Sequence, residues 1–150
     1  MSTYNDKFIV VGGNELRGEV SVQTSKNAVL PILAGSILCD KPLTLNNVPN
    51  ILDVNNMFNI LRDLGVKLEY VDKNCYIDAS NVNKVTLNQD LCKTLRSSIF
   101  LLGPLLARFK QAVISYPGGC DIGNRPIDLH IDAPDVWCFF NIKSAVKWGF

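Results

Sequence analysis

One stretch of the chain, YPGGCDIGNRPIDLH, gathers residues that could do chemistry together. Cys120 follows two glycines, and Arg125 stands five residues further along. A thiol reacts as its thiolate, and nearby positive charge and backbone N–H donors favour that form. Glycines let backbone amides approach an anion, and an arginine can hold a phosphate or carboxylate through two parallel hydrogen bonds. The stretch indicates a reactive cysteine in an anion-binding loop; a glycine-rich turn around a packed thiol is the alternative.

Two further cations lie where a helix would also favour an anion. Lys26 and Arg96 each stand near the start of an apolar segment with helical character, and the N-terminal end of a helix carries partial positive charge. The candidate substrate therefore carries phosphate, carboxylate or both. His130 could pair with Cys120, but a separation of ten residues fixes no geometry and no third orienting group is evident.

The composition indicates a folded chain without a strongly charged partner. The 150 residues are 47% hydrophobic and 19% charged, and the formal net charge is +1. Because no basic surface is indicated, we expect neither nucleic acid nor an anionic membrane as a partner. The start of the sequence lacks a signal-peptide pattern, and the longest apolar run, 99–107, is too short to span a bilayer. We therefore expect a cytoplasmic protein.

The spacing of the five cysteines predicts neither a metal site nor a disulfide framework. No two of them have zinc-ligand spacing and the sequence holds one histidine, so we expect no metal. Disulfides are also unexpected without an export signal. The cysteines other than Cys120 lie in apolar or strand-like surroundings and are predicted to be small core residues: Cys39, Cys75, Cys92 and Cys138.

Strand and helix patterns alternate along the chain and indicate the α/β class. A hairpin turn is predicted at Asp72–Lys73, a helix cap at Gly65, and Pro31 near the first turn of its helix. The predicted strands are 8–13, 18–23, 43–48, 66–71, 74–79 and 112–116. The predicted helices are 26–39, 53–65 and 92–109.

The pattern restarts after about 70 residues, which indicates an internal repeat. Lys26 and Lys93 lie 67 residues apart, and each is followed by a helix, a strand and a proline. The second copy carries about six extra residues, which fall in the loop of Cys120. Functional residues often lie in such inserted loops. After residue 131 the expected helix ending in leucine–glycine does not follow, so the second copy looks cut off.

Three stretches resemble a known enzyme family. Ser25–Leu33, Lys93–Phe109 and Tyr116–Ile131 are similar to the UDP-N-acetylglucosamine 1-carboxyvinyltransferases, the enolpyruvyl transferases of bacterial peptidoglycan synthesis. The resemblance covers about 7–131, as the N-terminal portion of such a protein. It implies transfer of enolpyruvyl from phosphoenolpyruvate to the 3-hydroxyl of UDP-N-acetylglucosamine, with release of phosphate and no metal or organic cofactor.

The resemblance also implies a fold. Each of the family's two domains is an inside-out α/β barrel of three repeats, with helices inside and sheets outside. The chain would hold a strand segment of one domain at 1–22 and less than two of the three repeats of the other at 23–131. The cysteine loop would lie at about 115–125, and 132–150 would be a tail that does not match. A missing remainder of the same protein would be a partner, and the chain alone would be inactive.

Site residues follow from the resemblance position by position. Cys120 matches the loop cysteine that donates a proton to phosphoenolpyruvate and that fosfomycin alkylates. Lys26 matches the lysine that binds phosphoenolpyruvate and helps the domains to close, and Asn27 matches a contact to the sugar nucleotide. Arg96 and Arg125 match arginines around the substrate anions. The segment that lines the uridine end of the site is Arg125, Pro126, Ile127, Asp128 and Leu129.

Simpler roles for these residues stay open. Lys26 and Arg96 could be solvated surface cations, and Asn27 could be a helix cap. For the whole chain, the alternative is a non-catalytic remnant that at most binds a uridine nucleotide or a partner chain.

Overall fold

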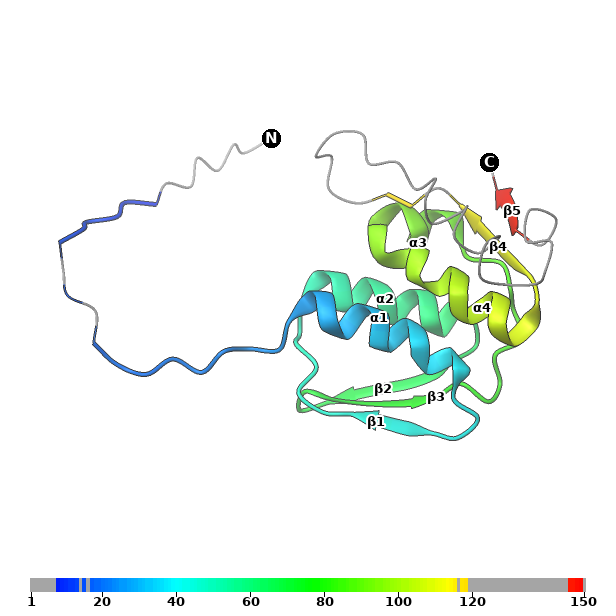
Figure 1. Ribbon diagram of the computed structural model, residues 1–150, viewed down its shortest axis with the longest axis horizontal. Helices are drawn as coiled ribbons and strands as arrows, with labels where there is room; N and C mark the ends of the chain where they lie inside the picture. The colour runs from blue at the N-terminus through cyan, green and yellow to red at the C-terminus, as the bar shows by residue number, and fades with distance from the viewer. Residues whose placement is uncertain (1–7, 14, 16, 116, 119–145, 150) are drawn as a thin grey trace.

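Helices cover one face of a three-stranded sheet, which forms the outer layer of the fold (Figure 1). A computed structural model describes residues 8–13, 15, 17–115, 117–118 and 146–149. Its elements are α1 (Lys26–Gly35), the 3-10 helix η1 (Ser36–Leu38), β1 (Leu43–Leu45), α2 (Leu52–Asp63), β2 (Lys67–Val71), β3 (Asn74–Asp78), α3 (Gln89–Thr94), the 3-10 helix η2 (Arg96–Leu101), α4 (Leu102–Phe109), β4 (Ala112–Ser115) and β5 (Val146–Gly149).

The three-stranded sheet confirms the predicted strands and hairpin. Its order is β1-β3-β2, and both pairs are antiparallel. Asp72 and Lys73 connect β2 to β3 with φ values of 49° and 64°, the left-handed conformation that tight hairpins favour. Leu68 and Ile77 are buried toward the helices, while their neighbour Tyr76 is exposed on the other face. The sheet therefore has one core face and one solvent face.

Helix α2 buries the stripe that its sequence predicts. Val54, Met57, Ile60, Leu61 and Leu64 are each at most 1% exposed. The residue after this stripe, a glycine, has a φ of +98°, so it provides the predicted left-handed cap. Helix α2 packs against α1, which lies beside it over the sheet (Figure 1).

Pro31 lies further into its helix than the sequence suggests. Helix α1 begins at Lys26, which makes Pro31 its sixth residue rather than a member of the first turn. A proline has no N–H, so the carbonyl of Asn27 does not receive the usual bond from four residues ahead. The N-cap position belongs to Ser25, and Asn27 is the second helical residue, which rules out Asn27 as the cap.

The predicted helix 92–109 is broken in two. Helix α3 starts earlier, at Gln89, because the Asn88 side chain accepts hydrogen bonds from two N–H groups of its first turn. The break falls at Leu95, which has extended backbone angles of −144° and 113°. Side chains satisfy the last carbonyls of α3 there: Thr94 Oγ1 donates to Leu91 O at 2.7 Å, and Asn56 Nδ2 to Thr94 O at 3.3 Å. These carbonyls accept no bond from a continuing helix.

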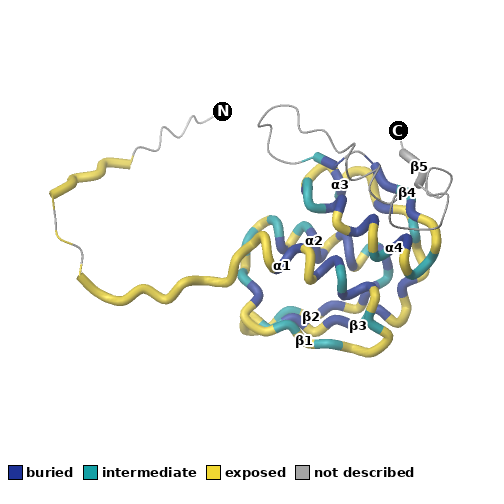
Figure 2. Tube along the Cα trace, in the orientation of Figure 1, coloured by how far each residue is buried: buried dark blue, intermediate teal, exposed yellow. Residues whose placement is uncertain are grey.

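The first predicted strands do not form. Residues 8–13 and 18–23 belong to no sheet, and Figure 2 colours this part of the chain as exposed. Its apolar side chains face solvent, with Phe8 97% and Val22 95% exposed. A strand needs a neighbour for its N–H and carbonyl groups, and no described residue pairs with these segments. The chain leads instead along an extended path into α1 (Figure 1).

Strand β4 forms where the sequence predicts it and begins a second sheet. It pairs in parallel with β5, which lies in the tail that was expected not to match. On its other side, Val113 N donates to Val85 O at 2.8 Å and Leu87 N donates to Val113 O at 2.9 Å. Within the described part of the chain, no helix is long and apolar enough to cross a bilayer.

Candidate functional site

Lys26 and Asp53 form an ion pair between the starts of two helices. Lys26 Nζ lies 2.6 Å from Asp53 Oδ2, and the two side chains are 49% and 32% exposed. Lys26 is the first residue of α1, and Asp53 lies in the first turn of α2. An aspartate suits a helix N-terminus, but a lysine opposes the helix dipole there. Asp53 compensates part of that conflict, and an anionic ligand would do the same.

The α3–η2 junction is tied to the same end of α2. Asn56 lies one turn after Asp53 and donates from Nδ2 to the carbonyl oxygen of Thr94 at 3.3 Å. Two residues later, Arg96 begins η2, which packs against α1. The start of α1, the start of α2 and the junction before Arg96 are therefore linked through direct contacts. We call Lys26, Asp53, Asn56, Thr94 and Arg96 the helix-end cluster.

Arg96 is half-buried at the start of a helical stretch. The sequence places it near a helix N-terminus, and the structure confirms this, although the helix starts afresh after the break at Leu95. A guanidinium at this position has the five donors and permanent charge that suit phosphate and carboxylate groups. The cluster therefore holds two cations, Lys26 and Arg96, at helix starts.

The structure describes only part of the predicted site. Asn27 is exposed and follows Lys26 in the first turn of α1, so these two residues share one end of the helix. Gly118, two residues before the predicted reactive cysteine, contacts the end of α3 through a bond from its N–H to Cys92 O at 3.0 Å. The remaining predicted residues lie outside the described part: Cys120, Arg125, Pro126, Ile127, Asp128, Leu129 and His130.

Two of the cysteines are core residues with suppressed acidity. Cys75 and Cys92 are both 0% exposed, as predicted, while Cys39 is half-buried and Cys138 lies outside the described residues. Burial raises the pKa of Cys75 to about 11, against a smaller opposing effect of Arg62. Burial also raises the pKa of Cys92, against smaller lowering effects of Ser98 and of the Ser115 backbone. At neutral pH both thiols stay protonated and unreactive.

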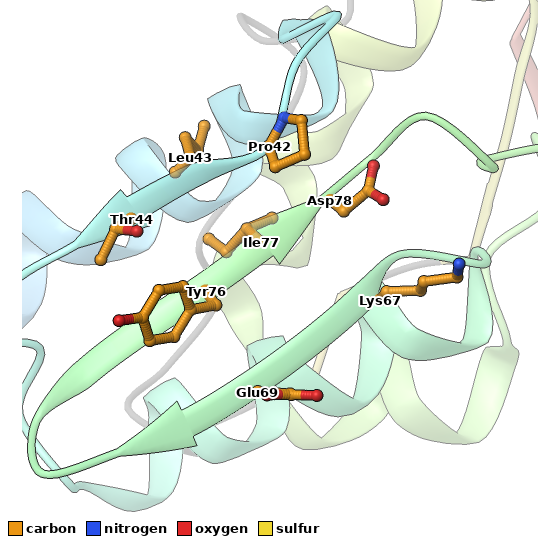
Figure 3. A pocket seen from close by; sticks show the side chains of 8 residues that line it. All are labelled: Pro42, Leu43, Thr44, Lys67, Glu69, Tyr76, Ile77 and Asp78. Carbon is orange, nitrogen blue, oxygen red and sulfur yellow. The ribbon is translucent and has the colours of Figure 1, made fainter.

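Two surface hollows lie outside the predicted site residues. One, of about 210 Å³, lies on the sheet and is lined by Pro42, Leu43, Thr44, Lys67, Glu69, Tyr76, Ile77 and Asp78 (Figure 3). The other, of about 520 Å³, is lined by Ser21, Val22, Gln23, Thr24, Asn47, Pro49, Asn50 and Lys73. Ser21–Thr24 come just before α1 in the sequence, and none of the helix-end cluster residues lines either of these two hollows.

Sequence reasoning missed Asp53 and Asn56. Both stand in the string DVNN at the start of a predicted helix, where an aspartate in the first turn is a recognisable signal. Their pairing with Lys26 and Thr94 depends on how α1, α2 and α3 pack, which the local pattern does not fix. Within the described residues, no group of three or more histidine, cysteine, aspartate or glutamate side chains could hold a metal ion.

Fold and site together describe an α/β protein with cations gathered at helix ends, and comparison with known proteins identifies its family. The family model for EPSP synthase (3-phosphoshikimate 1-carboxyvinyltransferase) matches residues 10–134, and the chain belongs to this family. The chain is 48% identical over 85% of its length to UDP-N-acetylglucosamine 1-carboxyvinyltransferase of Acinetobacter baylyi. The enzyme of the same name from Yersinia pestis is 48% identical over 84% of the chain.

A solved structure supports the fold. The enolpyruvyl transferase NikO of Streptomyces tendae superposes with a TM-score of 0.59 at 27% identity, over 67% of this chain and 24% of that one. The predicted α/β class and enolpyruvyl transferase fold are therefore confirmed. The chain spans about a third of the relatives it matches, 31% of the Acinetobacter protein and 30% of the Yersinia one.

Proposed function

We propose that this chain carries the phosphoenolpyruvate-binding helix ends of a UDP-N-acetylglucosamine 1-carboxyvinyltransferase of peptidoglycan synthesis, a cytoplasmic enzyme. The observation that carries the proposal is the Lys26–Asp53 ion pair, because it holds a cation at a helix start that favours anions. The hydrogen bond from Asn56 to Thr94 supports it, because it connects the segment before Arg96 to the start of α2. The 48% identity to enzymes of that name supports the choice of substrates.

The proposed reaction is an addition followed by an elimination. The 3-hydroxyl oxygen of the sugar bonds to C2 of phosphoenolpyruvate, the hydroxyl proton passes to a base, and Cys120 gives a proton to the methylene carbon. A base then takes a proton from the new methyl group as the C2–O bond to phosphate breaks, which gives the enolpyruvyl-sugar nucleotide and inorganic phosphate. Lys26 and Arg96 stabilise the phosphate and carboxylate charges throughout. Asn27 and the segment Arg125–Leu129 hold the sugar nucleotide.

The chain alone is expected to turn over little or no substrate. It spans about a third of its relatives, and by resemblance the carboxylate that deprotonates the sugar hydroxyl lies beyond position 150. The rest of the enzyme would be the partner of the apolar segment at 1–22, whose side chains at Val20 and Val22 are 90% and 95% exposed. Such exposed apolar side chains support a role for this segment in another domain.

Titration of the purified chain with each substrate tests the proposal. We expect phosphoenolpyruvate to bind, to bind more tightly when UDP-N-acetylglucosamine is present, and to bind weakly to Lys26→Met. A non-catalytic remnant would instead bind UDP-N-acetylglucosamine at most, with no response to phosphoenolpyruvate. A coupled assay for phosphate release tests the expectation of low turnover, and robust turnover by the 150-residue chain would contradict it.

A further inference from the structure

We propose that Gly118 is a positioning residue that seats the start of the cysteine loop on the last turn of α3, beside the junction that leads into Arg96. The proposal rests on the proposed function, because the placement of this loop matters for catalysis only if Cys120 reacts there. It goes beyond that function by assigning a task to a residue with no reactive group.

One carbonyl group near the end of α3 accepts hydrogen bonds from both the start of the cysteine loop and the junction before Arg96. Cys92 is the third residue from the end of this helix, and its carbonyl is among those that a helix leaves without an internal partner. Gly118 N donates to Cys92 O at 3.0 Å, and Leu95 N donates to the same oxygen at 3.3 Å. The start of the loop and the residue before Arg96 therefore share one acceptor.

Only glycine fits at this contact. A Cβ at Gly118 would lie 1.8 Å from the carbonyl oxygen of Lys93, 2.5 Å from its carbonyl carbon and 2.6 Å from its Cα. These are backbone atoms, which cannot swing aside as a side chain can. The reason is space and not conformation, because the glycines with positive φ in the described residues are Gly13, Gly18 and Gly65. Any other residue at position 118 would push the loop away from α3.

The contact between Gly118 and α3 involves a buried part of the chain. Cys92 and Ser115 are 0% and 5% exposed, and Pro117 is buried as well. On the far side of the junction, Asn56 ties the Thr94 carbonyl to α2. Cys92 is the buried residue of α3 and carries the acceptor carbonyl. We therefore expect an added Cβ at Gly118 to displace the start of the loop from this carbonyl.

The test compares Gly118→Ala with Gly103→Ala in the 150-residue chain. Gly103, in α4, has no atom within 4 Å of an added Cβ, so it is a matched control. The first readout is amide hydrogen exchange at residues 94–96 and 118, which does not depend on any enzymatic role. The second is the rate at which iodoacetamide alkylates Cys120 as a function of pH, read by peptide mass spectrometry.

We expect Gly118→Ala to speed exchange at these amides and to shift the Cys120 rate profile toward an ordinary thiol. Because the thiolate is the reacting form, a higher pKa should lower the alkylation rate at pH 7 several-fold. Gly103→Ala should change neither readout. Unchanged exchange or an unchanged profile in Gly118→Ala would overturn the proposal.

The outcomes also separate this proposal from the proposed function. Gly118→Ala could alter exchange while Cys120 of the original chain reacts no faster than Cys39. The contact between Gly118 and α3 would then exist without a reactive cysteine, and both the proposed function and the positioning role would fail. If Gly118→Ala does not fold, Asn56→Ala loosens the other side of the junction without a clash. That variant should shift the Cys120 profile in the same direction, and an unshifted profile would overturn the proposal.

Discussion

Lys26 Nζ lies 2.6 Å from Asp53 Oδ2, so the first residue of α1 is paired with a carboxylate in the first turn of α2. Both groups reach solvent, which makes the pair accessible to a ligand. A cation at the start of a helix is a local conflict that natural proteins retain mainly at functional sites. We therefore interpret this pair as the centre of the helix-end cluster rather than as a stabilising salt bridge.

The stability of the fold should depend little on this pair. A double-mutant cycle with Lys26→Ala and Asp53→Ala should give a coupling free energy of at most about 1 kcal/mol, because the side chains are 49% and 32% exposed. Urea unfolding of the four proteins measures it. Lys84 and Asp63 form a comparable pair, with 55% and 30% exposure at 3.2 Å, and their cycle is the control. A coupling of about 3 kcal/mol, as for a buried pair, would contradict the functional interpretation.

Binding of phosphoenolpyruvate should depend on the cations of the cluster. Lys26→Met and Arg96→Met should each weaken binding about tenfold, the effect of losing about 1.4 kcal/mol. Calorimetric titration at fixed ionic strength measures the affinity. Lys67→Met is the matched control, since it removes the same charge from the solvent face of the sheet (Figure 3). An equal loss in Lys67→Met would show that net charge alone attracts the anion.

Stability should fall in alkaline solution through Cys75. Its pKa is about 11 in the folded chain, raised by burial from an ordinary value near 9, so the folded state keeps this proton while the unfolded state loses it. The protonated thiol contributes up to about 3 kcal/mol to the free energy of unfolding. This contribution is intact below about pH 9 and is lost as the pH rises toward 11. Unfolding free energies measured between pH 8 and 11 should show a shallower decline in Cys75→Ala. Identical slopes would contradict the buried, protonated thiol.

The start of α3 should depend on its cap. Asn88 accepts hydrogen bonds from Asp90 N at 2.9 Å and Leu91 N at 3.2 Å, and Asn88→Ala should cost about 1 kcal/mol of unfolding free energy. The control is Asn59→Ala, an exposed position inside α2 where alanine favours the helix slightly. Thermal melting distinguishes the two. Equal melting temperatures would mean that the cap contributes nothing.

The elements that the sequence predicts correctly are those with strong local signals. The apolar spacing around Val54 and Met57 indicates α2, and the Asp72–Lys73 pair indicates the hairpin, because both features depend on neighbours in sequence. The break at Leu95 was not predicted, and the bond from Asn56 to Thr94 beside it joins two different helices, which no local pattern indicates. The strand predicted at 8–13 fails for a similar reason: its pattern is suitable, but the described chain offers it no partner.

The candidate site also has some features that the sequence predicts and others that depend on tertiary contacts. The sequence indicates the start of α1 at Lys26 and places Arg96 near the start of a predicted helix, 92–109, but it does not indicate the break at Leu95 after which Arg96 begins η2. It does not indicate that Asp53 would pair with Lys26, or that Gly118 would meet the carbonyl of Cys92, because both contacts are tertiary.

The rate at which fosfomycin alkylates each cysteine tests the central claim most directly. This reagent is an anionic epoxide, so it reports both a reactive thiol and an anion site next to it. We expect Cys120 to be alkylated at least about tenfold faster than Cys39, and Lys26→Met to remove most of the difference. Alkylation of Cys120 no faster than that of Cys39 would contradict it.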